Sequence, residues 1–574
     1  MDIVDLSSDS PSPIDEQSHP NVVDVLELDE PSNNENSKSS NDSNPQSYFM
    51  TLDRAAMERE RLLRISKAMG GGRAKRARAE SDDEVTMENA DDDSNSERNS
   101  YKLNYEDSFR QSNDSNQVQS MEAKRQREDV TNQLPFPCGV VKRTAVAGYS
   151  RTGNDISIGE VLQARKLRSA VLSAFQWDFD WILQKIFVGR TNLVLVVPAK
   201  GDDAQKSMRK LLEQVPKTRI CMPNMKGMIN CMHSKLQLLF YDNYLRVCVP
   251  SANLTDYDWG EGIGVIENYV YIHDFPLKSV SSGEPLPSFA RDLIYFLTAQ
   301  GMHSDIIQRL ETEVLWQGTE NVQFVHSIGG EHKGDKSIWR TGFPGLTKAV
   351  QAIGGNGSAG QIDYVISSLG SLTPVFVENI YNAATGKYYS ITSPPKPVES
   401  IPQKIKQRLR VYFPSHDTVA TAKGGTASAG TICFSKQFWN KPGFPKEILR
   451  DGRCTRQDCL MHEKVMFIRF DKPTMAPDGV RVAGAVYVGS ANMSESAWGK
   501  LVNDTSTRRA KLNLRNWECG ILLRIRSKNE AADDQTSETV EEMFSETIPI
   551  PMKTQNTQYH DKIPWFFLDK QTRR

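Results

Sequence analysis

Two short motifs in this chain each place a histidine two positions before a lysine. The first is "CMHSK" at 231–235 and the second is "CLMHEK" at 459–464, and their histidines are 229 residues apart. Each motif is followed by Ser-Ala-Asn, with a Trp six positions after the Asn. The recurring residues are His233, Lys235, Asn253 and Trp259, then His462, Lys464, Asn492 and Trp498. This period is too long for a solenoid and predicts two similar domains that contribute to one shared site.

Paired histidines suit the transfer of a phosphoryl group. A neutral imidazole can attack phosphorus, while a second, protonated imidazole gives its proton to the leaving oxygen. We expect the two lysines and two asparagines to hold the phosphate oxygens through the transition state. Glu267 and Glu518 each come just before an apolar run, and we predict that each carboxylate orients one histidine ring. No carboxylate cluster suited to Mg²⁺ accompanies this set, so the sequence predicts a reaction without metal or cofactor.

The apolar runs around these residues predict strands, twice in the same order. "TNLVLVVP", "KLQLLFYD" and "YLRVCVPSAN" are matched by "RLRVYFPS", "KVMFIRFD" and "RVAGAVYVGSAN". We interpret "KPTMAPDG" as a surface insertion, which lengthens the His-to-Asn spacing from 20 to 30 residues. Residues 157–186 start with a capping-box pattern and continue with helical spacing, which predicts a helix. The expected fold is α/β, with two similar domains of mixed sheets packed around a shared active site.

Composition changes near residue 134. Residues 1–134 lack Trp and carry 16 Lys/Arg against 29 Asp/Glu, which leaves 54 basic and 43 acidic residues in the rest of the chain. Such a polar segment cannot bury enough apolar surface to offset chain entropy, so we predict a disordered acidic tail over 1–137. The folded part is predicted to divide into a first half, 138–320, and a second half, 321–574. Its mild positive charge fits a polyanionic partner.

The tail contains three candidate recognition segments. "GGGRAKRARAESDDE" is either a nuclear import signal or a solvated charge run. Its basic residues are Arg73, Lys75, Arg76 and Arg78. "IVDLSSDS" at 3–10 and "VVDVLELDE" at 22–30 are β-prone runs flanked by acids, which could add a strand to a partner's sheet as SUMO-interacting segments do. The sequence thus favours a nuclear protein, with SUMO or repair-factor contacts through the tail.

Cysteine usage and hydropathy exclude several classes of protein. No stretch of 18 apolar residues exists, and the acidic start "MDIVDLSSDS" is unlike a signal peptide, so we expect an intracellular protein without membrane contact. Eight cysteines without a C-x-x-C pair argue against a disulfide framework or a zinc site. Cys454 and Cys459 enclose four residues; metal binding there is the alternative to reduced cysteines without a special role, and we favour the latter.

Paired His-x-Lys motifs with a downstream Asn resemble the phospholipase D superfamily. The usual motif of that superfamily continues with four residues and an Asp, where this chain has Phe240 and Arg469. The branch that lacks the Asp and keeps His-Lys-Asn in each half is tyrosyl-DNA phosphodiesterase, in a fungal-like form here. The resemblance runs from about residue 138 to the end, through "AVLSAFQWDFDW", "SANLTDYDW", "ISSLGSL", "GSANMSESAWG", "WECGILL" and "IPWFF".

The resemblance implies a DNA repair enzyme and a role for each histidine. His233 would attack the phosphodiester that links a tyrosine, left by a stalled type IB topoisomerase, to a DNA 3′ end, and would form a phosphohistidine. His462 would protonate the tyrosine and then activate water. The implied enzyme needs no cofactor, acts as a monomer and removes other 3′ blocking groups as well. The residues implied to bind the DNA are Lys235, Lys464, Ser368, Leu369, Gly370, Ser371 and Ser494. From the residues alone, 367–372 is a loop with hydroxyl and backbone N–H donors suited to phosphates.

Two positions depart from the pattern of animal members of this family. Glu267 stands where a Gln is expected, and we expect it to orient His233, because a carboxylate can balance imidazolium charge. Ile229 stands where a base-stacking Phe is expected. Trp177 is then the candidate for stacking on a base, and a place in the core is its alternative.

Three other functions are open to this sequence. One is another nuclease of the phospholipase D superfamily, and a second is a lipid-hydrolysing phospholipase D, which would be expected to keep the motif Asp. The third is a non-catalytic nuclear DNA-binding scaffold, which would need one His or Lys lost. All four of these residues are present.

Overall fold

The computed structural model describes residues 134–278, 285–388, 398–528 and 538–567. Residues 1–133 of the predicted tail, with its candidate import signal and two β-prone runs, lie outside the described residues. Among the helices that the structure describes, none is long and apolar enough to cross a membrane.

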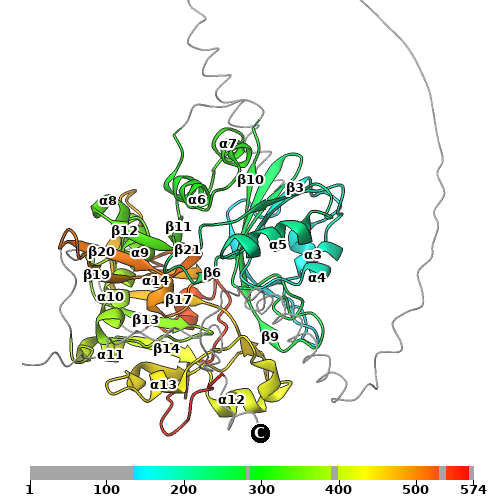
Figure 1. Ribbon diagram of the computed structural model, residues 1–574. Coiled ribbons are helices and arrows are strands. Elements are labelled where there is room, and N and C mark those ends of the chain that lie inside the picture. The colour runs from blue at the N-terminus through cyan, green and yellow to red at the C-terminus, as the bar shows by residue number, and fades with distance from the viewer. Residues whose placement is uncertain (1–133, 279–284, 389–397, 529–537, 568–574) are drawn as a thin grey trace, which may run out of the picture. The chain divides into compact units, whose positions relative to one another are not determined.

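The first half of the described chain forms an eight-stranded mixed sheet (Figure 1). Its order is β2 (Asp155–Ile156), β1 (Val140–Thr144), β10 (Tyr269–Pro276), β8 (Tyr244–Pro250), β7 (Leu236–Phe240), β3 (Ser169–Ser173), β4 (Asn192–Val196) and β5 (Thr218–Cys221). The side chains of β7 and β8 are all buried, as their continuous apolar runs predict. The helices of this part are α3 (Ile158–Leu162), α4 (Phe179–Gln184), α5 (Asp202–Leu212), α6 (Ser288–Ala299) and α7 (Ser304–Thr312).

The second half forms the main path of an eight-stranded mixed sheet, whose remaining strand, β6 (Cys231–Met232), comes from the first half. Its order is β11 (Val322–Ser327), β21 (Asn516–Arg526), β18 (Arg481–Gly489), β17 (Val465–Met475), β13 (Gly360–Val365), β14 (Leu409–Phe413) and β15 (Leu449–Asp451). Its α-helices are α8 (Asp335–Ile338), α9 (Gly342–Ala352), α10 (Pro374–Ala384), α11 (Gln403–Arg408), α12 (His416–Thr421), α13 (Lys436–Trp439), α14 (Glu495–Trp498) and α15 (Val540–Phe544). Two 3-10 turns are η1 (Gly425–Ser428) and η2 (Lys446–Ile448), and a small sheet has the order β12 (Gly330–Lys333), β20 (Ala510–Leu514) and β19 (Lys500–Asn503).

The two large sheets repeat one topology. In the order β1-β10-β8-β7-β3-β4-β5, the first four pairings are antiparallel and the last two are parallel. The order β11-β21-β18-β17-β13-β14-β15 has the same sequence of antiparallel and parallel pairings. The predicted α/β fold with two similar mixed sheets is therefore confirmed, and the seven strands from β1 to β5 of the first order correspond one by one to those from β11 to β15 of the second.

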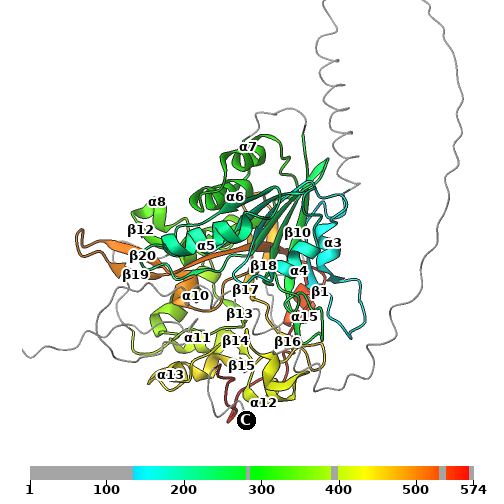
Figure 2. The same cartoon turned by 45° about the vertical axis from the view of Figure 1, so that its right-hand side comes forward.

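The halves meet through strands and through a shared core. β18 and β21 of the second sheet pack against β8 of the first. β18 also packs against β10, beside which it lies in Figure 2. One cluster of buried apolar side chains includes Leu238 of β7 together with Phe467 of β17 and Cys519 of β21. Two very short strands cross between the halves: β6 (Cys231–Met232) pairs with β21, and β16 (Leu460–Met461) pairs with β9 (Ile266–Glu267).

Two local predictions differ from the structure. The capping box at Ser157 and Glu160 is present, but helix α3 ends after five residues, and the stretch predicted as its continuation contains β3 in the middle of the first sheet. Pairing with β4 and β7 outweighs the helical spacing there, because it buries "SAVLS" between two strands. In the second half, β17 continues through "KPTM" with a bulge, so the first half of the predicted insertion is strand and its turn follows Met475.

Candidate active site

Cross-pairing between the halves brings the two histidines together. β6 ends one residue before His233 and β16 ends one residue before His462. The backbone N–H of His233 donates to the carbonyl of Trp517, and that of His462 donates to the carbonyl of Glu267, both at 2.9 Å. Each catalytic motif is therefore anchored by a strand of the opposite half.

Each imidazole is also held through its Nδ1 by a side chain of the opposite half. Nδ1 of His233 lies 2.9 Å from Oε2 of Glu518, and Nδ1 of His462 lies 3.0 Å from Oδ1 of Asn268. A ring whose Nδ1–H donates to such an oxygen leaves Nε2 with a lone pair for chemistry. Both rings are thus fixed in tautomer and direction, as the paired-histidine chemistry requires.

The prediction that Glu267 orients a histidine is wrong, because Asn268 is the counterpart of Glu518. Pro250 and Gly489 each precede the serine of a Ser-Ala-Asn motif, and they pair with Val270 and Gly520. Val270 and Gly520 therefore correspond, and so do Asn268 and Glu518, two positions before them. Successive side chains of a strand point to opposite faces, and a shift of one residue exchanges the faces. The carboxylate of Glu267 instead lies 2.8 Å from the Arg456 guanidinium.

The serine of each Ser-Ala-Asn supports these two side chains. Ser490 donates its hydroxyl to Oε2 of Glu518 at 2.5 Å, and Ser251 donates to Oδ1 of Asn268 at 2.8 Å. The same serine oxygens accept the backbone N–H groups of Cys519 and Tyr269. These hydrogen bonds therefore join the serine of each Ser-Ala-Asn motif to the segment that carries Glu518 or Asn268.

The asparagines of the motif have their amide oxygens tied down. Oδ1 of Asn253 accepts the backbone N–H of Gln176, and Oδ1 of Asn492 accepts those of Ser367 and Ser368, at 3.0–3.2 Å. An amide whose oxygen already accepts backbone N–H groups keeps its NH₂ group as a donor for a ligand. Both asparagines are thereby prepared to hold an anionic oxygen.

The two lysines are completely buried beside the histidines. Nζ of Lys235 donates to the carbonyl of His233 at 2.9 Å, and Nζ of Lys464 donates to that of His462 at 2.6 Å. Burial lowers the pKa of Lys235, although Glu518 opposes the shift. Burial and the neighbouring Lys235 lower the pKa of Lys464 well below its ordinary value. A bound phosphate anion would offset this crowding of cations.

The same surroundings shift the histidines and Glu518. Burial lowers the pKa of His233, with Glu518 opposing and Lys235 adding to the shift. Burial lowers the pKa of His462 well below its ordinary value, and Lys464, Lys235 and His233 add to the shift. Burial alone would raise the pKa of Glu518, but His233 and Lys235 lower it overall. His233 therefore faces an ionised carboxylate, whereas His462 faces a neutral amide.

Sequence reasoning missed one buried acid of the site. Oδ2 of Asp258 accepts the backbone N–H of Asn253 at 2.6 Å and lies 3.6 Å from Nδ1 of His462. Burial raises the pKa of this carboxyl. The second copy of the motif has Ala497 at the matching position, so comparison of "SANLTDYDW" with "SANMSESAW" could have found this acid.

A family model described as tyrosyl-DNA phosphodiesterase matches residues 140–560, which is most of the chain. The chain belongs to this family. It is 22% identical over 405 residues to tyrosyl-DNA phosphodiesterase 1 of Arabidopsis thaliana, covering 68% of this chain and 62% of that protein. It is 24% identical over 405 residues to a probable tyrosyl-DNA phosphodiesterase of Caenorhabditis elegans, covering 67% and 83%. This chain thus spans less than two thirds of the Arabidopsis relative.

The fold is also that of a solved structure from the family. The crystal structure of yeast tyrosyl-DNA phosphodiesterase superposes with a TM-score of 0.50 at 18% identity, covering 74% of this chain and 97% of that chain. The Saccharomyces cerevisiae tyrosyl-DNA phosphodiesterase 1 sequence is 24% identical over 415 residues, covering 65% of this chain and 71% of that protein.

The loop that the family resemblance assigns to DNA is tied to the second Asn. The N–H of Ser368 is taken by Asn492, that of Leu369 by Cys433 and that of Gly370 by Met493. The expectation that these N–H groups bind phosphates is therefore wrong. The partly exposed Ser368 and Ser371 side chains stay suitable for that task.

Ser494, also implied by the family, is the N-cap of α14. Its Oγ accepts the N–H of Ala497 at 3.1 Å, and its hydroxyl proton is still able to donate to a ligand. The side chain is buried, so a contact with DNA would be made through this hydroxyl alone.

The aromatic ring beside His233 is Phe175, which sequence reasoning did not single out. Its ring lies 5.3 Å from that of His233 and is partly exposed. Trp177 is 5% exposed, donates its indole N–H to the carbonyl of Ala174 and stacks on Phe179. Trp177 thus belongs to the core, and the proposal that it stacks on a base is wrong. Ile229 is also buried.

Proposed function

We propose that this protein hydrolyses the phosphodiester between a tyrosine and a DNA 3′ end, as a metal-independent DNA repair enzyme. The observation that carries the proposal is the pair of imidazoles, each with Nδ1 held by the opposite half and each beside a buried Lys and a prepared Asn. This arrangement supports two consecutive in-line displacements at one phosphorus. Membership of the tyrosyl-DNA phosphodiesterase family supports the choice of substrate.

In the first step, His233 is the nucleophile. Its Nε2 forms a bond to phosphorus as the bond to the tyrosine oxygen breaks, and His462 gives its proton to that oxygen. The phosphorylated imidazole is cationic, and the Glu518 carboxylate 2.9 Å from Nδ1 stabilises it. The neutral Asn268 holds the proton of His462 less tightly, which suits a group that must release it. The electrostatic difference between the two rings supports this assignment of roles.

In the second step, His462 is the base. It takes a proton from water as the water oxygen attacks phosphorus, and the bond from phosphorus to His233 breaks. The products are a DNA 3′ phosphate and the free enzyme. Lys235, Lys464 and the amides of Asn253 and Asn492 hold the equatorial oxygens in both steps, in a site where burial strengthens these interactions.

The DNA would lie along the rim of this site. Phe175 takes the stacking role that was expected of Trp177, because it is the partly exposed ring beside His233. The Ser368, Ser371 and Ser494 hydroxyls are candidate donors to the strand. Removal of other 3′ blocking groups is part of the proposal, since the mechanism needs only a leaving group that His462 can protonate.

The wider setting of the activity is also a proposal. Arg73 and the basic residues after it support import into the nucleus, and the β-prone runs at 3–10 and 22–30 support SUMO or repair-factor contacts. We expect a monomer, because the topological repeat already supplies both sets of site residues within one chain.

The test is release of tyrosine from a 3′-phosphotyrosyl oligonucleotide, followed on a gel in EDTA. We expect turnover to continue, because the phosphate is held by Lys and Asn side chains. Activity that stops in EDTA and returns with Mg²⁺ would contradict the metal-independent mechanism. Cleavage within the strand without tyrosine release would indicate a superfamily nuclease, and no reaction at all would indicate a non-catalytic scaffold.

A further inference from the structure

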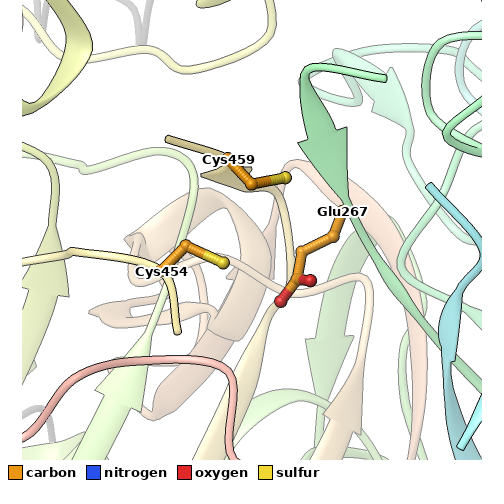
Figure 3. A group of neighbouring side chains, drawn as sticks. All are labelled: Glu267, Cys454 and Cys459. Atoms are coloured by element: carbon orange, nitrogen blue, oxygen red, sulfur yellow. The ribbon is translucent and has the colours of Figure 1, made fainter. Parts of the chain in front are cut away.

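A second cluster of reactive groups lies buried behind the catalytic site. Figure 3 shows Glu267, Cys454 and Cys459 gathered around one space, with Glu267 on a strand of the first half. The carboxylate and the two Sγ atoms offer ligand atoms within 4.8 Å of one another. All three side chains are at most 6% exposed. The cluster therefore joins two thiols of one half to a carboxylate of the other.

Few hydrogen-bond donors reach the carboxyl groups of this cluster. Glu267 and Glu463 are fully buried, and none of their four oxygens has a hydrogen-bond partner of good geometry. The two carboxyls face each other, and two ionised carboxylates can only accept. Arg456 lies 2.8 Å from Oε2 of Glu267, and Arg143 lies 3.8 Å from the same atom. The charge of one Glu267 oxygen is thus balanced by Arg456, and a Glu267 oxygen lies within 4.8 Å of both Sγ atoms.

The thiols are arranged as thiolate ligands usually are. Sγ of Cys454 accepts the backbone N–H of Arg456 at 3.2 Å, a contact that stabilises a thiolate. The four residues between the cysteines form a turn, closed by the N–H of Cys459 on the carbonyl of Arg456 at 3.2 Å. This turn returns the chain so that both sulfurs approach Glu267.

We propose that Cys454, Cys459 and Glu267 bind one structural zinc-class ion, and that Glu463, the neighbour of Glu267, turns toward it as the fourth ligand. Two thiolates and oxygen ligands in a closed, four-coordinate site suit Zn²⁺. Neighbouring ligand atoms around tetrahedral zinc are about 3.3–3.9 Å apart, so a small contraction of the cluster is sufficient. Binding displaces the two thiol protons, and the carboxyl proton of Glu463 where that group is protonated, as one divalent ion enters the cluster. This revises the sequence-based expectation that these cysteines have no special role.

The ion would act on the structure and not on the phosphate. Glu267 and Asn268 are adjacent, and their side chains leave the backbone on opposite sides, so the cluster lies behind the residue that holds His462. Cys459 directly precedes β16, whose partner strand β9 carries Glu267. The ion would clamp the segment before His462 onto the first half. The inference does not depend on the tyrosyl substrate, since a protein without that activity could hold the same ion.

The first measurement is the metal content of the full-length protein, purified without chelators. We expect about one zinc per chain, as for other closed structural sites. The Cys454→Ser, Cys459→Ser double variant should lose it. Cys248→Ser is the matched control, because Cys248 is another buried cysteine and lies in β8, away from the cluster. Zinc retained in the double variant, or absent from the unmodified protein and the control alike, would overturn the proposal.

A second measurement does not depend on the folding of a variant. Metal-free protein is titrated with Co²⁺, and thiolate ligation is followed by its charge-transfer absorption in the near ultraviolet. We expect saturation at about one Co²⁺ per chain, competed by Zn²⁺. Absence of this absorption, or recovery of Cys454 and Cys459 as a disulfide in freshly purified protein, would refute a thiolate metal site.

Loss of the ion is also distinguishable from failure of the proposed function. Activity lost after zinc removal, and restored by Zn²⁺ but not by Mg²⁺, supports the clamp and leaves the catalytic mechanism intact. Full activity and an unchanged melting temperature in a protein proven free of zinc would contradict a structural role for the ion.

Discussion

The two halves share a strand order but differ in the group that holds the histidine. Ser490 and Glu518 in the second half correspond to Ser251 and Asn268 in the first, with equivalent hydrogen bonds to the serine and to the backbone. The difference between them is a carboxylate against an amide. A duplicated scaffold thus supplies two imidazoles in similar positions, and a single side chain on each side makes one suitable as nucleophile and the other as acid.

A second difference concerns the surroundings of His462. Asp258 approaches it from the first half, whereas Ala497 occupies the matching position in the second. His462 therefore has a neutral partner at hydrogen-bond distance and a buried acid slightly further away. His233 has its acid in direct contact.

The largest effects should come from the histidines themselves. His233→Ala removes the route to a covalent intermediate, so we expect kcat to fall by at least about 10⁴ without any adduct. His462→Arg should slow turnover by about 10²–10⁴ and accumulate protein covalently joined to DNA, because tyrosine, with a phenol pKa of about 10, can leave without full protonation. The adduct is measured as an acid-labile shifted band on a denaturing gel. Adduct in the His233 variant and never in the His462 variant would reverse the roles.

Replacing Glu518 tests the effect of the negative charge beside Nδ1 of His233. Glu518→Gln keeps an acceptor for Nδ1 but removes the negative charge, and we expect kcat to fall by about 10–100-fold. The carboxylate favours the imidazolium, so its loss lowers the pKa of His233 further. The neutral nucleophile then persists to lower pH, and the acid limb of kcat/KM should shift downward. An unshifted acid limb would show that His233 does not respond to this charge.

The reciprocal change, Asn268→Asp, should have a smaller effect. A carboxylate here favours protonated His462 and raises its pKa from the lowered value of the free enzyme. The basic limb of kcat/KM should move to higher pH, while kcat changes by less than about tenfold because the hydrogen bond to Nδ1 is kept. Asn268→Leu, which has no acceptor, is the control; if it behaves like Asn268→Asp, the charge is not the cause.

The two serines offer a finer comparison. Ser490→Ala removes a hydrogen bond to a carboxylate, and Ser251→Ala removes one to an amide. Hydrogen bonds to charged groups are about twice as strong as neutral ones, so Ser490→Ala should lower kcat by up to about tenfold and Ser251→Ala by less. Steady-state kinetics of both variants check the order, and the opposite order would mean that the shared backbone contact of the serine dominates.

The smallest effect on the purified enzyme should come from removing the tail. Deletion of residues 1–134 takes away an acidic, Trp-free segment outside the repeat. We expect turnover on a short oligonucleotide to stay within a few-fold, while the location of the protein in the cell changes. Both are measured on the same truncated chain, and a large loss of purified turnover would assign the tail to the active site.

The sequence by itself determined which residues recur and therefore most of the site. The repeat of His-x-Lys, Ser-Ala-Asn and Trp predicted the paired His233 and His462, their lysines and asparagines, and two sheets of similar order, because side-chain chemistry and apolar runs are local properties. The structure brings both histidines and both lysines together. Glu518 was predicted to orient a histidine, but Glu267 was the residue assigned to His233, and the structure places Glu518 beside His233 instead.

Only the tertiary structure decided what each neighbour of these residues does. Asn268, and not Glu267, holds His462, because a strand exchanges its faces with every residue and no sequence pattern fixed that register. β3 formed within a predicted helix because two neighbouring strands pair with it. Cys454 and Cys459 meet Glu267 across 187 residues of chain, counted from Glu267 to Cys454. Contacts between segments so far apart depend on how the two halves dock, and local spacing carries no information about that.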